Sequence, residues 1–430
     1  MNRSWDDSCG RHTPRRRRRS MHRRSAAVFL TALLATAALV AGATAAMASG
    51  GFGAGVARNL AGALDRIIPD ARPAPPPPVL TTAPRPGPPA APSGPARAQV
   101  SAGTLHDVAL TGDDGPVPGT LAPDARTWTS TAPFDYGTRY RWSGTWTLED
   151  GSTRPLTGAF ATVAPDDTVE AAMNIRDGGE VGVGAPVVLS FEKDLSDEAK
   201  ARVEKALTVT TSKPVEGAWA WLPDTAEGSR VHYRPREYWP AHTRVRVRAA
   251  LHGLDLGAAG WADGDLDRSF TIGRSQIVRA DTRSHRIVVV RDGREVASYD
   301  ASYGMESDPR RVTRSGVHVV MAKSQKVLMT NEDYGYVDEP QFWAVRISNN
   351  GEFIHANPSS SDAQGRRNVS HGCVNLSTKD AKEFFASATF GDPVEVTGSS
   401  QPLTAADGDL YDWTIPWDEW TSMSALAQAR

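Results

Sequence analysis

The sequence predicts a mainly β protein, in which two β-sandwiches precede a third β-rich domain with a short helix near its end. Between residues 98 and 273, short alternating apolar and polar segments are broken by Gly, Pro and Asp, which is typical of antiparallel sandwiches. From residue 274 a second series of short apolar segments begins, joined in part by an Asp-Gly turn. The 430 residues, 40% hydrophobic and 23% charged, are enough for two to four soluble domains.

The N-terminal segment, residues 1–48, has the pattern of an export signal. Nine arginines and two aspartates precede residues 25–48, which are apolar and carry no charge. This order is typical of a cleaved signal peptide or an uncleaved signal-anchor. Ala46-Met47-Ala48 fits a cleavage site, and the apolar run also reaches the ~20 residues that span a bilayer. Both interpretations stay open, and an uncleaved segment would attach the protein to the membrane.

The start of the chain has two interpretations as well. Met-His-Arg-Arg-Ser at 21–25 would begin a more ordinary signal, so residues 1–20 are either a cytoplasmic tail or lie before the true start. In each case the rest of the chain is exported, and we expect it in the cell wall or on the outer face of the plasma membrane. From residue 49 onward there are 39 basic and 48 acidic residues, and this acidic balance argues against a nucleic-acid partner.

Residues 49–97 are predicted to be a stalk and a proline-rich linker. Apolar side chains recur at helical spacing in residues 50–70, which fits a short amphipathic helix or a loosely ordered stalk. Residues 71–97 are dense in proline, which excludes a helix or the interior of a sheet. At ~3 Å per residue such an extended spacer would reach roughly 80 Å.

We assign residues 98–165 to the first sandwich and residues 166–273 to the second. A short helix is expected within 193–207. Trp219, Trp221 and Trp239 are interpreted as core or rim aromatics, with stacking on carbohydrate as the alternative. Strands are expected at 139–148, 187–191, 207–211, 230–233, 243–249 and 270–273.

Residues 274–398 form the third predicted domain. The segment 377–385 begins with a Ser/Thr cap and continues with helical spacing, so it is predicted to be the short helix. Residues 399–430 are a tail too aromatic to be loose, and we predict that it packs on this domain. Strands are expected at 277–281, 285–291, 295–299, 316–322, 342–347, 352–355 and 393–397.

Cys373 is the only cysteine in the exported part of the chain, because Cys9 precedes the apolar run. A nucleophilic cysteine needs a stabilised thiolate, a nearby base and donors for the oxyanion of its acyl intermediate. Gly372 permits a tight turn that brings the amides of residues 372 and 373 together. His355, at the end of a predicted strand, is the better candidate base, and His371 is assigned to ordering the loop or shaping the oxyanion site.

Two other interpretations of these residues were weighed. A lone cysteine is often a small core residue, but the polar surroundings and the nearby histidines argue against this here. His355, His371 and Cys373 are also acceptable zinc ligands, yet no Cys-x-x-Cys or His-x-x-x-His pair accompanies them, so we expect no metal. His318 lies within an apolar strand pattern and is interpreted as structural.

Four motifs follow one another in the last third of the chain: Gly-Glu-Phe-Ile-His at 351–355, Ala-Gln-Gly at 363–365, Val-Ser-His-Gly-Cys-Val-Asn at 369–375 and Trp-x-Ile-Pro-Trp-Asp-Glu-Trp at 413–420. Together they resemble the signature of the L,D-transpeptidases, the YkuD-domain enzymes of bacterial cell walls. The resemblance covers residues 274–420. It is strongest to the actinobacterial type, which has a membrane-proximal signal and two immunoglobulin-like (Ig-like) domains before the catalytic domain.

The resemblance implies a role for each matching residue. Cys373 matches the nucleophile, and His355 matches its proton acceptor and donor. Ser370, His371 and Gly372 match the motif around the thiolate and oxyanion hole. The positions that match substrate-contacting and lid residues are Asn375, Asn350, Gly351, Met329 and Tyr334.

The sequence departs from the family pattern at two places. The predicted lid is shorter between Gly335 and Trp343, so either Tyr336 or Phe342 takes the aromatic position that contacts substrate. Ala356 replaces a serine that often follows the histidine, which is tolerable if only the backbone carbonyl orients the imidazole.

The resemblance also implies a reaction. The Cys373 thiolate, nucleophilic near neutral pH, attacks the third residue of a tetrapeptide stem and releases D-alanine, and the thioester then passes to the side-chain amine of a diamino acid in a second stem. The product is a 3→3 cross-link, no cofactor is needed, and carbapenem-type β-lactams are expected inhibitors. The alternatives are an L,D-carboxypeptidase, a variant that attaches a protein to peptidoglycan, and a non-catalytic wall-binding module.

Overall fold

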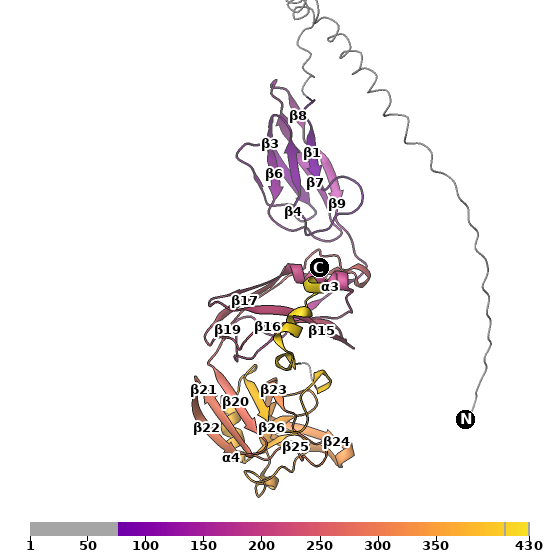
Figure 1. Cartoon of the computed structure of the whole chain (residues 1–430). Coiled ribbons are helices and arrows are strands. Elements are labelled where there is room, and N and C mark those ends of the chain that lie inside the picture. The colour runs from indigo at the N-terminus through magenta and orange to yellow at the C-terminus, as the bar shows by residue number, and fades with distance from the viewer. Residues whose placement is uncertain (1–75, 408–409, 429–430) are drawn as a thin grey trace, which may run out of the picture. The chain divides into compact units, whose positions relative to one another are not determined.

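The computed structural model describes residues 76–407 and 410–428, where strands predominate and form three two-sheet domains (Figure 1). The predicted mainly β class is therefore confirmed. The predictions for the export signal, for residues 50–70 and for the first part of the proline-rich segment lie outside the described residues. Within the described part of the chain, no helix is long and apolar enough to cross a membrane.

The first Ig-like domain consists of two sheets, with strand orders β1-β2-β6-β5 and β4-β3-β7-β8, and β9 also pairs with β7. Buried tryptophans from both sheets fill its core, and the rings of Trp128 and Trp142 meet edge to face with centroids 5.3 Å apart. Its strands are β1 (Leu80–Ala83), β2 (Arg97–Val100), β3 (Thr104–Gly112), β4 (Gly115–Pro116), β5 (Gly119–Leu121), β6 (Thr127–Ser130), β7 (Arg139–Thr147), β8 (Thr153–Pro155) and β9 (Gly158–Ala161).

The predicted end of the linker at residue 97 is wrong. Leu80–Ala83 pairs antiparallel with Arg97–Val100, so the first domain begins near residue 80. These four residues contain no proline. They form a strand at the edge of a sheet, where the proline that follows them removes no hydrogen bond between strands. Because prolines are dense in the rest of residues 71–97, this short strand without proline was not predicted.

The second Ig-like domain has sheets of order β11-β13-β16-β15 and β12-β19-β17-β14, with a small β10–β18 pair. Trp219, Trp221 and Trp239 are buried in or beside its core, as predicted. Its elements are β10 (Thr168–Val169), β11 (Ala171–Met173), β12 (Gly179–Val181), β13 (Val187–Phe191), α3 (Asp197–Ala206), β14 (Leu207–Thr211), β15 (Gly217–Thr225), β16 (Gly228–Pro235), β17 (Arg244–Ala249), η1 (Gly257–Ala259), β18 (Trp261–Ala262) and β19 (Leu266–Ile272).

The third domain has sheets of order β22-β21-β20-β28-β23 and β24-β25-β26-β27, whose buried residues form one core with α4. Its elements are β20 (Gln276–Asp281), β21 (Arg286–Arg291), β22 (Arg294–Asp300), β23 (Gly316–Val319), β24 (Ala322–Asn331), η2 (Glu332–Tyr334), β25 (Tyr336–Arg346), β26 (Phe353–Ala356), η3 (Pro358–Ser360), β27 (Val374–Leu376), α4 (Thr378–Ser387) and β28 (Pro393–Thr397).

The long hairpin β24–β25 was only partly predicted. Its first strand, Ala322–Asn331, was missed, because nearly all of its side chains are exposed or half-buried and it shows no buried face to reveal a period of two. Of the two residues predicted to form a lid, Tyr334 lies in the segment 332–334 at its tip and Met329 lies on β24.

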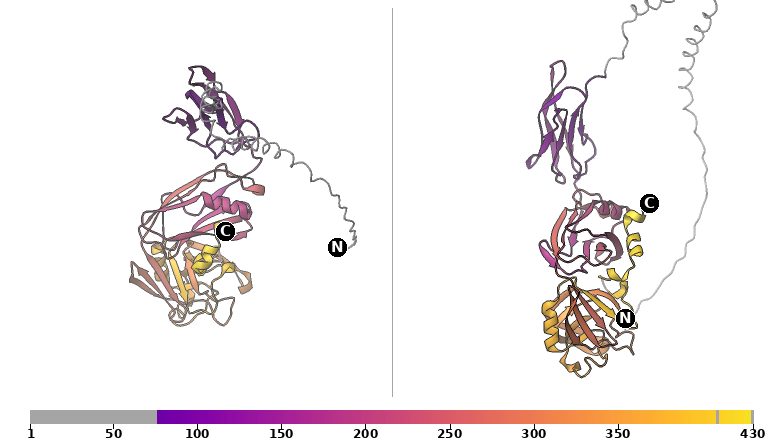
Figure 2. Two further views of the ribbon diagram at one scale, coloured as in Figure 1. Left: turned by 45° about the horizontal axis from the view of Figure 1, so that its top comes forward. Right: turned by 60° about the vertical axis from the view of Figure 1, so that its left-hand side comes forward.

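The C-terminal tail contains η4 (Ala405–Asp407), η5 (Asp412–Thr414), α5 (Trp417–Ser422) and α6 (Ala425–Gln428). The tail contacts the third domain at its beginning, where Leu403 N–H donates to Ser315 O, and at η5, which lies beside β23. Residues 410–428 pack mainly on the second Ig-like domain (Figure 2), where Trp420 Nε1 donates to Ala218 O at 3.0 Å. The reason is that Ala220 and Leu222 on β15 form an apolar cluster with the tail's aromatic side chains.

Candidate functional site

The candidate site is organised by two adjacent parallel strands, β26 and β27. Their register pairs His355 with Asn375, and Cys373 lies immediately before β27. Since side chains alternate along a strand, residues 373 and 375 share a face with His355. From the strand spacing, the Cα atoms of Cys373 and His355 are roughly 8 Å apart. Both strands are buried, so the core fixes this arrangement.

Cys373 is half-buried, and its Sγ lies 3.5 Å from the Gly351 carbonyl oxygen. Burial of the sulfur raises the pKa of the Cys373 thiol to about 12, a hydrogen bond with the Phe353 backbone opposes this rise, and the Glu352 carboxylate adds to it. A thiol whose pKa is raised needs a base to accept its proton during attack.

His355 has the geometry of such a base. It is 3% exposed, and its Nδ1 lies 3.0 Å from Ala356 O. A carbonyl oxygen only accepts, so Nδ1 carries the proton and Nε2 keeps its lone pair. Burial lowers the pKa of His355 to about 4. The imidazole is thus neutral near pH 7, and the carbonyl of Ala356 orients the ring without the serine that is often found at this position.

The loop before Cys373 is held by hydrogen bonds to its backbone. Ser370 Oγ donates to Cys373 O at 2.5 Å and accepts from the Gly372 amide at 3.2 Å. Gly372 has φ +124°, a backbone conformation that favours glycine. Of the two amides predicted to form the oxyanion hole, that of Gly372 already has a partner in this structure.

Two side chains that sequence reasoning missed also hold this loop. Thr313 Oγ1 donates to Gly372 O at 2.8 Å and accepts from the Gly304 amide at 2.9 Å. The Arg311 guanidinium donates to Val369 O at 2.9 Å. Neither residue belongs to a recognisable motif, and both lie some 60 positions before the cysteine, so the sequence offered no signal for them.

His371 is exposed and packs against the tip of the hairpin. Its ring centroid lies 4.5 Å from that of Tyr334 and 5.7 Å from that of Tyr336. Burial and the charge of Arg311 lower the pKa of His371. Burial raises the pKa of Tyr336, and the charge of an ionised Cys373 adds to this rise.

The remaining predicted residues are placed differently. Asn375 is 2% exposed, and within the described residues its Oδ1 has no hydrogen-bond partner. Asn350 is hydrogen-bonded to Ser348, and Gly351 has φ +99°. Met329 lies half-buried on β24, opposite Glu339 of β25. Among the described residues, no hydrogen bond or ring contact connects Met329 to Cys373.

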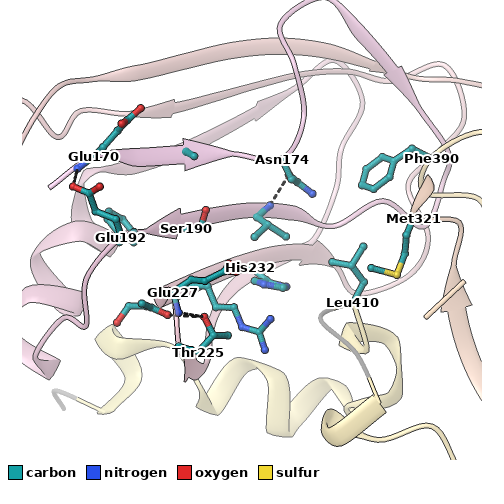
Figure 3. Close-up of a pocket in the computed structure, with 17 residues that line it drawn as sticks. Glu170, Asn174, Ser190, Glu192, Thr225, Glu227, His232, Met321, Phe390 and Leu410 are labelled. Carbon is teal, nitrogen blue, oxygen red and sulfur yellow. Dashed lines mark hydrogen bonds between the residues drawn. The ribbon is translucent and has the colours of Figure 1, made fainter. Parts of the chain in front are cut away.

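A separate cavity of about 700 Å³ lies away from the cysteine, between the second Ig-like domain and Met321, Phe390 and Leu410 (Figure 3). His232 lines it, and its Nδ1 is 2.9 Å from Asp412 Oδ1. Over residues 76–407 and 410–428 there is no group of three or more His, Cys, Asp or Glu side chains placed to hold a metal ion.

The chain matches two family models. The L,D-transpeptidase catalytic domain model matches residues 275–396, and a bacterial Ig domain model matches residues 89–255. A solved structure of an L,D-transpeptidase in complex with imipenem is 32% identical, covers 54% of this chain and 100% of its own, and superimposes with a TM-score of 0.45.

Two curated relatives from Mycobacterium tuberculosis extend over most of the chain. L,D-transpeptidase 5 is 50% identical over 336 residues, which are 78% of this chain and 74% of that protein. L,D-transpeptidase 2 is 36% identical over 335 residues, which are 76% of this chain and 79% of that protein. The chain belongs to the L,D-transpeptidase family.

Proposed function

We propose that this protein forms 3→3 cross-links in peptidoglycan through a thioester on Cys373. The observation that supports the proposal is the parallel register of β26 and β27, which pairs His355 with Asn375, two residues after Cys373. A partly exposed thiol, a buried base and an ordered glycine turn are the parts that acyl transfer needs.

The first step is attack on the donor stem. His355 Nε2 accepts the thiol proton as Sγ attacks the carbonyl of the third residue, a diamino acid, of a tetrapeptide stem. The proton passes to the leaving amine, and D-alanine is released as the thioester forms. Because the pKa of Cys373 is high and that of His355 is low, proton transfer accompanies the attack and does not precede it.

The second step is transfer to the acceptor. The side-chain amine of a diamino acid in another stem attacks the thioester, and the thiol regains its proton through His355. The Cys373 amide, within the turn shaped by Ser370, Gly372 and His371, is the donor that we assign to the oxyanion. Attack by water at this point would make the protein an L,D-carboxypeptidase, and attack by a protein amine would make it a protein-to-peptidoglycan ligase.

We assign substrate contacts to the hairpin tip and to the strand edge beside the thiol. Tyr334 and Tyr336 form the lid together with His371. Asn350 and Gly351 line the donor peptide, and the Gly351 carbonyl already contacts the thiol. Asn375 and Met329 complete the assigned set. The buried, unpartnered Oδ1 of Asn375 fits a role at the base of the cleft.

The proposed setting is outside the cytoplasm, at the cell wall, with membrane attachment through the N-terminal segment if it is not cleaved. A relative has been solved in complex with imipenem. We propose that carbapenems acylate Cys373 in this chain as well, because the strained lactam carbonyl replaces the donor carbonyl.

The reaction is tested by mass spectrometry of the full chain incubated with a disaccharide-tetrapeptide. We expect a cross-linked dimer with loss of one D-alanine, and no product with Cys373→Ala. Tripeptide monomer without dimer would show a carboxypeptidase. No product, together with a Cys373 that a carbapenem acylates no faster than a free thiol, would leave only the non-catalytic wall-binding module.

A further inference from the structure

The interior of the catalytic domain holds a second histidine, His318, whose ring is completely buried on β23. Its Nδ1 lies 3.2 Å from Ile347 O, and its Nε2 lies 2.9 Å from Arg314 O. Both partners are backbone carbonyl oxygens, which only accept hydrogen bonds. A neutral imidazole has one N–H, so the two contacts can both be hydrogen bonds only if both nitrogens are protonated.

A counter-charge is present beside this ring. Glu352 is 2% exposed, and its Oε2 lies 3.7 Å from His318 Nδ1. This oxygen has no hydrogen-bond partner among the described residues. The other oxygen, Oε1, accepts from the Arg314 amide at 2.9 Å and lies 3.6 Å from Arg314 Nη1. A buried carboxylate needs such partners to remain ionised.

The other elements around β23 bring no competing charge to the ring. Val394 on β28 is the residue paired with His318. Asp412, on η5 beside β23, is hydrogen-bonded to His232. In the described part of the chain, the charged group beside the His318 ring is therefore Glu352. Its carboxylate also lies beside the Arg314 guanidinium.

The pair lies directly under the catalytic loop. Glu352 immediately precedes β26, and its Cγ is 3.8 Å from the point where a Cβ of Gly372 would stand. The carboxylate disfavours the neighbouring thiolate, as the direction of its effect on the Cys373 pKa shows. A cation that compensates this carboxylate therefore reduces the cost of forming negative charge on Sγ.

We propose that His318 is held as a buried imidazolium, paired with Glu352, and that it is a positioning residue which compensates the carboxylate beside Cys373. Its effect on the reaction rests on the proposed role of Cys373, whereas its protonation does not. The proposal assigns His318 no contact with substrate.

Protonation is tested directly by nitrogen NMR of the histidine side chains in the full chain, with His318→Gln to identify the signal. We expect two similar ring-nitrogen shifts, the signature of an imidazolium, from pH 6 to pH 8. Two widely separated shifts at pH 7 would mean a neutral ring and would overturn the proposal. In Glu352→Gln, which keeps an acceptor for the Arg314 amide, we expect the ring to become neutral within this range.

The link to the thiol is tested by the rate at which iodoacetamide alkylates Cys373 at pH 8. His318→Gln leaves the Glu352 carboxylate uncompensated and should decrease the rate by up to about tenfold, because an opposite charge nearby shifts a pKa by about one unit or more. In Glu352→Gln the His318 ring also becomes neutral, so His318→Gln made in that variant should leave the rate unchanged. His232→Gln, which changes another fully buried histidine beside a carboxylate, is the matched control and should leave the rate unchanged. A purely structural role of His318 would give the same change with and without Glu352. Failure of the wild-type thiol to react would contradict the proposed function and leave the NMR result standing.

Discussion

His355 in the catalytic domain and His232 in the second Ig-like domain are both buried, yet their hydrogen bonds give them different roles. The Nδ1 of His232 lies 2.9 Å from a carboxylate oxygen of Asp412, which comes from the C-terminal tail 180 positions away. The Nδ1 of His355 donates to the carbonyl of the next residue, Ala356. The distant carboxylate joins two segments of the fold, whereas the local carbonyl only fixes a tautomer. Burial alone therefore does not distinguish a structural histidine from a base.

The largest expected difference between the two residues is in catalysis. His355→Ala should lower the rate of dimer formation by about 10²–10⁴-fold, the usual contribution of a general base. The fraction of the His232→Ala protein that remains folded should form dimer at the wild-type rate. The measurement is dimer yield against time by mass spectrometry, corrected for the folded fraction. A His355→Ala rate within tenfold of the wild type would remove His355 from the mechanism.

The next effect is on stability and concerns the partner of His232. Asp412→Ala leaves a fully buried histidine without its carboxylate, so we expect a loss of about 3–5 kcal/mol in the free energy of unfolding. Asp418→Ala changes an exposed aspartate on the same tail and should cost no more than about 0.5 kcal/mol. Urea unfolding followed by tryptophan fluorescence gives both values. Equal losses of stability in the two variants would show that the buried His232–Asp412 pair contributes no more than an exposed aspartate.

His355 should also make the stability of the protein depend on pH. The folded pKa of His355, about 4, lies below its ordinary value of 6.5, so the unfolded chain binds more protons between these values. Stability should therefore decrease as pH falls from 6.5 to 4, by about 3 kcal/mol from this residue. His355→Gln should flatten the curve in that window. An unchanged pH dependence in the variant would show that other groups cause the acid loss.

The smallest effect concerns the loop that positions the thiol. Thr313→Val removes the donor to Gly372 O and the acceptor for the Gly304 amide, both buried. We expect a loss of about 1–2 kcal/mol in stability and slower acylation of Cys373 by a carbapenem. Thr208→Val, at an exposed strand position, is the control. Acylation at the wild-type rate would mean that the loop keeps its shape without Thr313.

The fold class and the residues around Cys373 were predictable, because both follow from patterns of neighbouring residues in the sequence. Period-two segments predicted most strands of the third domain but only β7 in the first Ig-like domain. The Ser/Thr cap predicted α4, where Ser377 Oγ accepts from the Asp380 amide. His318 was expected within a buried strand pattern, and its ring is fully buried on β23. The two carbonyl oxygens near this ring were not predictable, since they belong to Arg314 and Ile347, and only the fold brings these together.

What could not be predicted depends on contacts that are distant in sequence. Thr313 and Arg311 hold the catalytic loop through backbone carbonyls, which leave no trace in residue spacing. The β24 strand has no buried face, so its pattern resembles a loop. The aromatic residues of the tail showed that it would pack, but not that Ala218 and Leu222 of the second domain would receive it.

The tail has a consequence for the order in which the protein matures. It is made after the catalytic domain, yet Trp420 and Met423 bond to β15, a strand that is complete some 200 residues earlier. The apolar surface of β15 therefore stays uncovered until the catalytic domain and the tail have been made. Folding of the second Ig-like domain is thus complete only after residues on the far side of the catalytic domain have joined it.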